Sequence, residues 1–367
     1  MPLNRRDLLI GLGGLSTAAA ATVLGQPGRR DRKVGYAIVG LGGYAMNQIL
    51  PQFANCSLSK VTALVSGDPA KARKAAQQYG VPERSIYDYA TFDRIRDNED
   101  VDVVYVILPN SMHAEYTIRA AKAGKHVLCE KPMSVSVAEA EAMIAACRAA
   151  GRKLMIGYRS HFEPTNIHLM RLRKEQAVGR TRFIQSEHGF SIGDPTQWRL
   201  KRALAGGGSL MDIGIYSIQA LRYGSGEEPT SVTAHENTDR SDPRFREVED
   251  LLDWTFTFPS GALGHGVSSY SSNHQHLRLT GTEGWVDMEP ATGYGGHRMR
   301  MRKDNEEGVV TPPAGPAVNQ FVGQLDHMAE CVITGRDPIV PGEEGLRDMR
   351  IIEAIYRSAR EGRSVAL

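Results

Sequence analysis

The sequence lacks the features that mark several large classes of protein. Its net charge is only +2 at neutral pH, whereas nucleic-acid-binding proteins usually carry a basic excess. Its four cysteines (Cys56, Cys129, Cys147 and Cys331) show no CxxC motif and no paired spacing, so a metal site or a disulfide framework is not expected. Beyond the first 25 residues, no apolar run is long enough to cross a membrane. The 367 residues therefore indicate a globular protein with room for two domains.

The amino terminus differs from the rest of the chain. Paired arginines, Arg5 and Arg6, precede a mildly apolar run rich in Gly and Ala from Leu8 to Leu24. This pattern resembles a twin-arginine export signal, although a mitochondrial-type or disordered leader would share some of its features. We expect residues 1–25 to be the signal and residues 26–33 a short arm. The twin-arginine machinery would then export the folded protein to the periplasm, and the mature protein would not be embedded in a membrane.

A dinucleotide-binding turn follows the arm. Val34 to Val39 reads as a buried strand, and a helix is expected from about Tyr44 to Phe53. Between them lies a G-x-G-x-x-A turn, in which the first glycine permits the turn, the second admits a pyrophosphate and the alanine allows close packing. The predicted cofactor-binding residues here are Gly40, Gly42, Gly43, Tyr44 and Ala45.

The end of the second strand, Val61 to Val65, bears on the choice of nucleotide. NAD-binding domains commonly place a carboxylate there for the ribose, whereas a 2′-phosphate is better held by neutral and cationic groups. Here Ser66 and Gly67 come first and Lys71 lies within one helical turn, which favours NADP. The alternative is NAD bound through Asp68, with the cations on a solvated helix face.

Three further strands predict a cleft at one edge of a parallel sheet, because the carboxyl ends of such strands meet there. They are Val101 to Leu108, Val127 to Cys129 and Lys153 to Ile156. The residues that follow the first two of these strands and are expected to face the cofactor are Pro109, Asn110, His113, Glu130 and Lys131. A solvated Glu-Lys pair and a histidine that only holds backbone are the alternatives. Residues 34–157 are thus predicted to form a Rossmann domain.

Residues 158–367 predict an α+β domain. Alternating runs indicate a mostly antiparallel sheet, with strands at Thr181 to Ser186, Val232 to Glu236, Leu251 to Phe258, Ala262 to Ser271, His276 to Thr280 and Trp285 to Met288. Helices are expected at Asn166 to Gln176, Asn319 to Thr334 and Gly345 to Glu361, and the polar stretch from Arg298 to Pro316 reads as a loop.

One segment of this second half carries candidate chemistry. Three glycines, 206–208, precede Asp212 and Tyr216, which are four residues apart and would share a helix face. A carboxylate and a phenol that meet Lys131 could form a proton-transfer pair, since a nearby cation favours the phenolate. The alternative is a helix-capping aspartate and a core tyrosine.

Together, Gly40-x-Gly42, Glu130-Lys131-Pro132 and Gly206-Gly207-Gly208-Ser209-Leu210-x-Asp212 resemble the family of glucose–fructose oxidoreductase and inositol dehydrogenase. The resemblance extends from Val34 to Val365. Much of that family has histidine where this chain has Tyr216, which is similar to the glucose–fructose oxidoreductase branch.

The resemblance implies an NADP-dependent enzyme with tightly held cofactor that acts on the CH–OH groups of sugars. An aldose such as glucose would be oxidised to its aldonolactone, and a second sugar would then be reduced to its alditol. Lys131, Asp212 and Tyr216 would be catalytic, with Tyr216 as the acid/base. Arg159, Trp198 and Arg199 would lie near the cofactor, Tyr158 and Tyr294 near the substrate, and a dimer or tetramer is implied.

One departure is the short arm, since glucose–fructose oxidoreductase has a long proline-rich arm that embraces the cofactor or a neighbouring subunit. An aldose–aldose oxidoreductase, in which the second sugar is also an aldose, fits as well as one that uses fructose. An exported enzyme finds no pool of free nicotinamide cofactor, which favours regeneration by a second sugar. A simple aldose dehydrogenase that releases NADPH, and a non-catalytic sugar- or nucleotide-binding protein, are the other readings.

Overall fold

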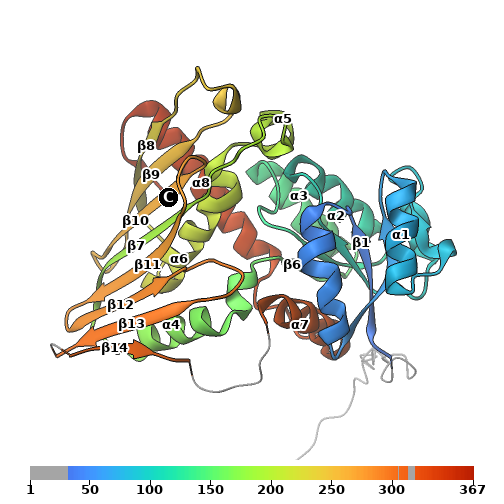
Figure 1. Cartoon of the computed structure of the whole chain (residues 1–367), viewed down its shortest axis with the longest axis horizontal. Helices are drawn as coiled ribbons and strands as arrows, with labels where there is room; N and C mark the ends of the chain where they lie inside the picture. The colour runs from blue at the N-terminus through green and yellow to red at the C-terminus, as the bar shows by residue number, and fades with distance from the viewer. Residues whose placement is uncertain (1–31, 305, 313–318) are drawn as a thin grey trace, which may run out of the picture. The chain divides into compact units, whose positions relative to one another are not determined.

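The computed structural model describes residues 32–304, 306–312 and 319–367. The predicted export signal and residues 26–31 of the predicted arm lie outside the described residues. Within the described part, strands gather in two sheets, one parallel and one mixed, and helices pack on each (Figure 1). The predicted fold class, a Rossmann domain followed by an α+β domain with a mostly antiparallel sheet, is confirmed.

The first sheet is parallel, with the strand order β3-β2-β1-β4-β5-β6 among the described residues. This is the order of a dinucleotide-binding fold: β2 and β3 are added on one side of β1, and β4, β5 and β6 are added on its other side. The strands are β1 (Val34–Val39), β2 (Ser59–Val65), β3 (Ile86–Tyr87), β4 (Val103–Val106), β5 (His126–Cys129) and β6 (Leu154–Ile156).

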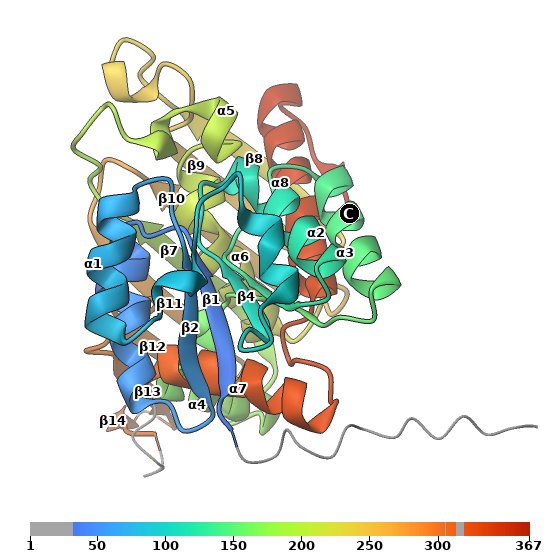
Figure 2. The same cartoon turned by 90° about the vertical axis from the view of Figure 1, so that its right-hand side faces the viewer.

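Both faces of this sheet are buried, which explains why its strands are apolar throughout. Ala37 and Val39 of β1 pack into one hydrophobic cluster with α2 (His113–Lys122) and α3 (Val137–Ala149). Tyr36 and Ile38 point the other way, into a cluster with α1 (Pro69–Tyr79) and α7 (Gln320–Thr334). Figure 2 shows α1 on one side of β1 and β2, and α2 and α3 on the other. Successive side chains of each strand point to opposite faces of the sheet, so each strand contributes to both hydrophobic clusters.

Local signals set the limits of α1. The carboxylate of Asp68 accepts hydrogen bonds from the backbone N–H groups of Ala70 and Lys71, and Pro69 occupies the first turn, where no N–H is needed. Gly80 ends the helix with φ of 67°, a left-handed conformation that glycine adopts without a steric penalty.

The second sheet runs β14-β13-β12-β11-β7-β10-β9-β8-β15 in the described residues. Every neighbouring pair is antiparallel except β7 and β10. The strands are β7 (Thr181–Gly189), β8 (Ser231–Asn237), β9 (Leu251–Thr257), β10 (Leu263–Ser269), β11 (His274–Gly281), β12 (Gly284–Glu289), β13 (Arg298–Lys303), β14 (Glu306–Val310) and β15 (Val365–Ala366).

Helices cover only one face of the second sheet in the described part of the chain (Figure 1). They are α4 (Pro164–Lys174), α6 (Ile215–Ser225) and α8 (Gly342–Glu361), and a short α5 (Arg202–Ala205) precedes the glycine loop. The helix α8 contacts both β8 and α3, so the two sheets share one continuous core. No helix among the described residues is both long and apolar enough to cross a membrane.

Two predicted elements differ from the structure. The stretch predicted as a loop from Arg298 to Pro316 contains β13 and β14, because Arg and Met alternate along β13 and its methionines turn toward the core. The predicted helix from Tyr44 to Phe53 is a short π-helix (Ala45–Ile49) followed by a 3₁₀ helix (Leu50–Asn55). Pro51 lacks an N–H group and so cannot continue a regular α-helix there.

Candidate active site

The glycine turn after β1 has the shape that a dinucleotide requires. Gly40 has φ of 94°, and a Cβ atom there would lie 2.2 Å from the carbonyl oxygen of Ile107. At Gly42 an added Cβ would meet nothing within 4 Å, and at Gly43 only the tip of Asn47 at 3.9 Å, so the space beside the turn is open. The predicted residues therefore fit a bound pyrophosphate.

The end of β2 carries the residues that bear on the choice between NADP and NAD. Asp68 is occupied as the cap of α1, and the backbone N–H of Asp68 donates to the hydroxyl of Ser66. Both of these bonds from the helix reach Oδ1 of Asp68, which leaves Oδ2 of this exposed carboxylate able to accept from a ribose hydroxyl. Lys71 stays exposed in the first turn of α1, where it is available to a phosphate. NADP held by Ser66 and Lys71 and NAD held through Asp68 therefore both stay predictions.

Lys131, at the carboxyl end of β5, meets Asp212 from the second domain. Its Nζ donates to the Asp212 carbonyl oxygen at 2.5 Å and lies 3.3 Å from Asp212 Oδ1. The other carboxylate oxygen, Oδ2, accepts from Arg199 Nε at 2.9 Å and from the hydroxyl of Tyr270 at 3.0 Å. The alternative of a solvated Glu-Lys pair is thus excluded, because Lys131 is paired and its side chain is only 11% exposed.

These contacts set the charge of the cluster. Burial opposes ionisation of Asp212, but Arg199 and Lys131 outweigh it and hold the pKa of this carboxyl well below its usual range. Burial likewise favours neutral Lys131, yet the neighbouring Tyr216, Asp212 and Glu130 keep its pKa above the ordinary value. The low pKa indicates that Asp212 is ionised at neutral pH.

The phenol of Tyr216 lies against two cations. Lys131 Nζ is 4.8 Å from the centre of its ring, and Arg159 Nε donates to its hydroxyl at 3.1 Å. The side chain of Tyr216 is only 8% exposed. A phenol that contacts two cations in this way has the surroundings that an acid/base group for a sugar hydroxyl would need. The structure therefore brings together the three predicted catalytic residues. Asp212 lies in a π-helix (Leu210–Gly214) and Tyr216 in α6, so the two do not share one regular α-helix as the spacing predicted.

Arg159 is held from the opposite side by main-chain oxygens. Its guanidinium donates to Thr292 O at 2.5 Å, to Gly293 O at 3.0 Å and to the side chain of Gln320 at 2.5 Å. It is 3% exposed and lies over the rings of Tyr216 and Tyr294, each 4.7 Å from its Cζ. Such a fully bonded guanidinium is a fixed positive charge next to the phenol.

The glycine loop before Asp212 is positioned by a buried carboxylate. Glu249 accepts from the N–H groups of Gly208 at 2.8 Å and Leu210 at 3.1 Å, and from the hydroxyl of Tyr356 at 2.8 Å. A Cβ atom at Gly208 would lie 2.1 Å from the Glu249 carbonyl oxygen, so only glycine allows this approach. The loop is therefore rigidly packed, and it presents Asp212 to Lys131.

Glu130 is also buried beside the cluster. Its carboxylate accepts from the hydroxyl of Tyr105 at 2.5 Å and from the backbone N–H of Lys131 at 3.3 Å. Burial raises its pKa, while Tyr105 and Lys131 lower it in part. Glu130 lies next to Gly157, where an added Cβ would come within 2.8 Å of the carboxylate. It therefore lines the floor of the site at the junction of β5 and β6.

Several predicted cofactor residues are tied to the protein itself. His113 has both ring nitrogens within 2.9 Å of main-chain oxygens, those of Pro132 and Leu108, and burial lowers its pKa to about 4. Its position favours the alternative in which it holds backbone. Asn110 donates to Ala205 O at 2.9 Å, and Pro109 accepts from the N–H of Met112. These two brace the strand end.

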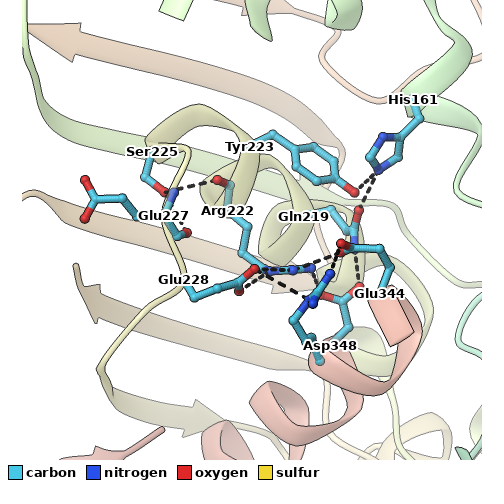
Figure 3. A network of polar contacts seen from close by, with 10 residues as sticks. His161, Gln219, Arg222, Tyr223, Ser225, Glu227, Glu228, Glu344 and Asp348 are labelled. Carbon is cyan, nitrogen blue, oxygen red and sulfur yellow. Dashed lines mark hydrogen bonds and ion pairs between the residues drawn. The ribbon is translucent and has the colours of Figure 1, made fainter. Parts of the chain in front are cut away.

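Tyr158, predicted near the substrate, is not brought to the Lys131 cluster. It is 2% exposed and its phenol faces Asp348, so burial and that carboxylate raise its pKa well above the usual value. Asp348 belongs to a buried polar network between α6 and α8 that also contains Arg222 and Gln219 (Figure 3). The substrate role of Tyr158 stays a prediction, and its position indicates an internal support.

The remaining predicted residues lie near the cluster. Trp198 lies under the guanidinium of Arg199, 4.7 Å from Cζ to ring centre. Tyr294 contacts the ring of Tyr44, with 6.4 Å between ring centres.

Two residues of the site were missed at the sequence level. Tyr270 donates to Asp212, and His188 lies 5.4 Å from Tyr216, ring centre to ring centre, with its Nδ1 2.9 Å from the hydroxyl of Thr292. Burial and the nearby Lys131 lower the pKa of His188 to about 3, so it is neutral. Alternation along the predicted strand from Ala262 could have placed Tyr270 inward, whereas His188 follows the predicted end of its strand at Ser186.

No group of three or more His, Cys, Asp and Glu side chains with metal-binding geometry occurs in residues 32–304, 306–312 and 319–367. Cationic and phenolic side chains, together with the glycine turn, dominate the site.

Comparison with known proteins gives this arrangement a context. Two family models match: "oxidoreductase family, NAD-binding Rossmann fold" over residues 34–158, and "oxidoreductase family, C-terminal alpha/beta domain" over residues 173–367. The chain is 58% identical to a solved aldose-aldose oxidoreductase from Caulobacter crescentus, over 92% of this chain and 100% of that one, with a TM-score of 0.90. It is 31% identical over 346 residues to an NADP(+)-dependent D-xylose 1-dehydrogenase of Haloarcula marismortui, covering 92% of this chain and 94% of that protein. A 3-ketoreductase from Actinomadura kijaniata, 23% identical with a TM-score of 0.79 over 89% of this chain and 98% of that one, shares the fold.

Proposed function

Since the chain belongs to the oxidoreductase family that joins an NAD-binding Rossmann domain to a C-terminal alpha/beta domain, we propose that it is a sugar oxidoreductase whose NADP stays bound through the whole reaction cycle. An aldose is oxidised to its aldonolactone, which leaves. A second sugar then enters the same site and is reduced to its alditol, in a ping-pong sequence. The resemblance inferred from the glycine turn, the Glu-Lys-Pro run and the glycine loop is confirmed.

The observation that carries this proposal is the phenol of Tyr216 between Lys131 and Arg159. Bound NADP would supply the hydride acceptor for the first sugar and the hydride donor for the second. Tyr216 takes the proton from the sugar hydroxyl in oxidation and returns it in reduction. Lys131 and Arg159 stabilise the negative charge on the phenolate and on the sugar oxygen. Asp212 orients Lys131 and Arg199 and offers a carboxylate to a sugar hydroxyl.

In this proposal, an aldose is favoured over fructose as the second substrate. The 58% identical relative is an aldose-aldose oxidoreductase. The D-xylose dehydrogenase relative, at 31% identity, supports the simple dehydrogenase as the second candidate. The two candidates differ in whether the cofactor leaves after each turnover.

A spectrum of the extensively dialysed protein separates them. Glucose is added without any cofactor, and the absorbance band of reduced nicotinamide is followed. We expect the band to appear with glucose and to vanish when a second sugar is added. A dialysed protein that shows no band until NADP is supplied would move the simple dehydrogenase to first place.

We also propose that the chain is exported folded by the twin-arginine route to the periplasm. The support is the Arg5-Arg6 pair ahead of a weakly apolar run. Changing both arginines to lysine in the full chain is expected to keep the protein in the cytoplasmic fraction. Equal periplasmic recovery of both forms would contradict this route.

A second copy is proposed to pack on the face of the second sheet that bears no helix among the described residues. This face carries apolar side chains in register, among them Leu263, Phe183 and Trp285. Leu263 is 44% exposed in the single chain. The variant Leu263→Glu is expected to lower the mass measured by light scattering to that of one chain, because a charge in such a patch opposes burial.

A further inference from the structure

The segment from Pro290 to His297, here called the strap, links the second domain to the active site. Its main chain is anchored at several points. The N–H of Ala291 donates to Gln275 O, the oxygens of Thr292 and Gly293 accept from Arg159, and His297 Nδ1 lies 2.7 Å from Pro290 O. Such a segment holds the side chains that it carries in fixed places.

The strap presents Tyr294 to two rings on the Rossmann side. Tyr44 directly follows the glycine turn, and its ring centre is 6.4 Å from that of Tyr294. Phe321 lies in α7, which packs on the parallel sheet, and its ring centre is 5.4 Å from Tyr294 and 6.2 Å from Tyr44. The three rings therefore join the strap to the glycine turn.

Tyr294 contacts residues at both ends of the region that a bound dinucleotide would occupy. A cofactor with its pyrophosphate at the glycine turn and its reactive end at Lys131 must pass between these two points. Tyr294 contacts both ends, through Tyr44 at the turn and through Arg159, which stacks on it and bonds Tyr216. Tyr294 is nevertheless 54% exposed, so a large part of its side chain has no partner among the described residues. A large, half-exposed ring on an anchored segment is suited to cover a flat ligand.

We propose that Tyr294, docked against Tyr44 and Phe321, retains the cofactor by closing this passage. Tyr294 thereby acts on the nucleotide and not only, as the sequence predicted, near the sugar. This inference rests on the proposed function, because retention matters only to an enzyme that keeps its NADP between half-reactions.

The test measures exchange of bound NADP and does not depend on turnover. The holoenzyme is mixed with excess isotopically labelled NADP, and the label held by the protein after rapid gel filtration is followed over time. Tyr294→Ala is expected to exchange about tenfold faster than the parent, the scale expected for loss of two aromatic contacts. Tyr294→Phe keeps the ring and is the matched control, with an expected rate within about twofold of the parent.

A double-variant cycle separates retention from general loosening. Tyr44→Ala is expected to accelerate exchange similarly, and adding Tyr294→Ala to it is expected to bring little more, because the two rings act as one contact. Additive acceleration by the two changes would overturn the docking that we propose. If Tyr294→Ala does not fold, as judged by its melting curve, Tyr294→Leu is measured instead, since it keeps apolar bulk and loses the flat ring.

The outcomes distinguish this inference from the proposed function. Slow exchange in both the parent and Tyr294→Ala would overturn the role of Tyr294 and leave the coupled cycle standing. Fast exchange in the parent that Tyr294→Ala accelerates further would support the role of Tyr294 and contradict the coupled cycle. Equally fast exchange in both proteins would overturn the two together.

Discussion

Two buried clusters of charge in this molecule use the same residue types in opposite proportions. At the active site one carboxylate, Asp212, is paired with two cations, Lys131 and Arg199. Between α6 and α8, three carboxylates surround one buried cation, because the guanidinium of Arg222 lies 2.8 Å from Asp348, 2.9 Å from Glu344 and 2.6 Å from Glu228 (Figure 3). A second, more exposed cation, Arg347, also pairs with Glu344 and Glu228, so carboxylates outnumber cations there by three to two.

One buried carboxyl in each cluster has its pKa shifted, and the two shifts have opposite directions. The pKa of Asp212 is held far below its usual range, whereas burial raises the pKa of Asp348 despite the nearby Arg222. A site with surplus positive charge is prepared for an oxyanion, which an alcohol becomes as it loses its proton. A cluster with surplus negative charge offers nothing to such a substrate and instead ties α6 to α8. The ratio of cations to carboxylates thus separates the catalytic cluster from the structural one.

The largest expected effect comes from Tyr216→Phe. The ring and its packing stay, while the group that exchanges the proton is lost, so kcat should fall about 10³-fold. Tyr223→Phe is the matched control, because Tyr223 lies on the same helix and hydrogen-bonds His161 away from the cluster. Its kcat is expected to stay within about twofold of the parent. Equal losses in steady-state assays of the two variants would contradict the acid/base role of Tyr216.

Removing the cation from each cluster should separate stability from activity. Arg222→Met leaves buried Asp348 without its cation, and the unfolding free energy is expected to drop by about 3–5 kcal/mol at neutral pH. Arg199→Met should cost far less stability, because Arg199 is 33% exposed and Asp212 keeps Lys131, but it should lower kcat/KM. Denaturant titrations and kinetics on both variants check this. A catalytic defect larger in Arg222→Met than in Arg199→Met would reverse the assignment.

The charge of Asp212 gives a prediction about pH. Because its folded pKa is depressed, Asp212 is ionised throughout the range above about pH 5. Asp212→Asn should lower kcat/KM about 10²-fold at every such pH and leave the acid limb of the profile in place. Rate profiles of the parent and the variant test this. An acid limb that disappears in Asp212→Asn would show that Asp212 titrates after all.

The smallest effect concerns buried histidines. Burial lowers the folded pKa of His113 and His161 to about 4 and of His188 to about 3, below an unfolded value of about 6.5. The stability that these neutral histidines contribute is present above about pH 6.5 and is lost as the pH falls from there toward 4, by up to about 1.4 kcal/mol per pH unit for each. His161→Gln should make the fall in unfolding free energy shallower in denaturant titrations at about pH 7 and pH 5. An unchanged slope would mean that His161 does not titrate on unfolding.

Most of the parallel sheet could be predicted from local patterns. The strand from Val34 to Val39 and its glycine turn depend on burial of consecutive residues and on positive φ at Gly40, both of which are local demands. The hairpin of β13 and β14 was missed because its arginines hid a short alternation with Met299 and Met301. The sequence of a short strand with charged outward residues resembles that of a polar loop, because few apolar residues mark its inward face.

The sequence by itself determined the class of site: a glycine turn, a lysine at a strand end, and an aspartate four residues before a tyrosine. Tertiary structure alone decided what each group does there. The bond from Arg159 to Tyr216 spans 57 positions and that from Tyr270 to Asp212 spans 58. The burial that leaves Tyr158 facing Asp348 and His113 facing backbone arises only when distant elements pack. Protonation and orientation depend on neighbours in space, and a linear pattern carries no information about which neighbours those are.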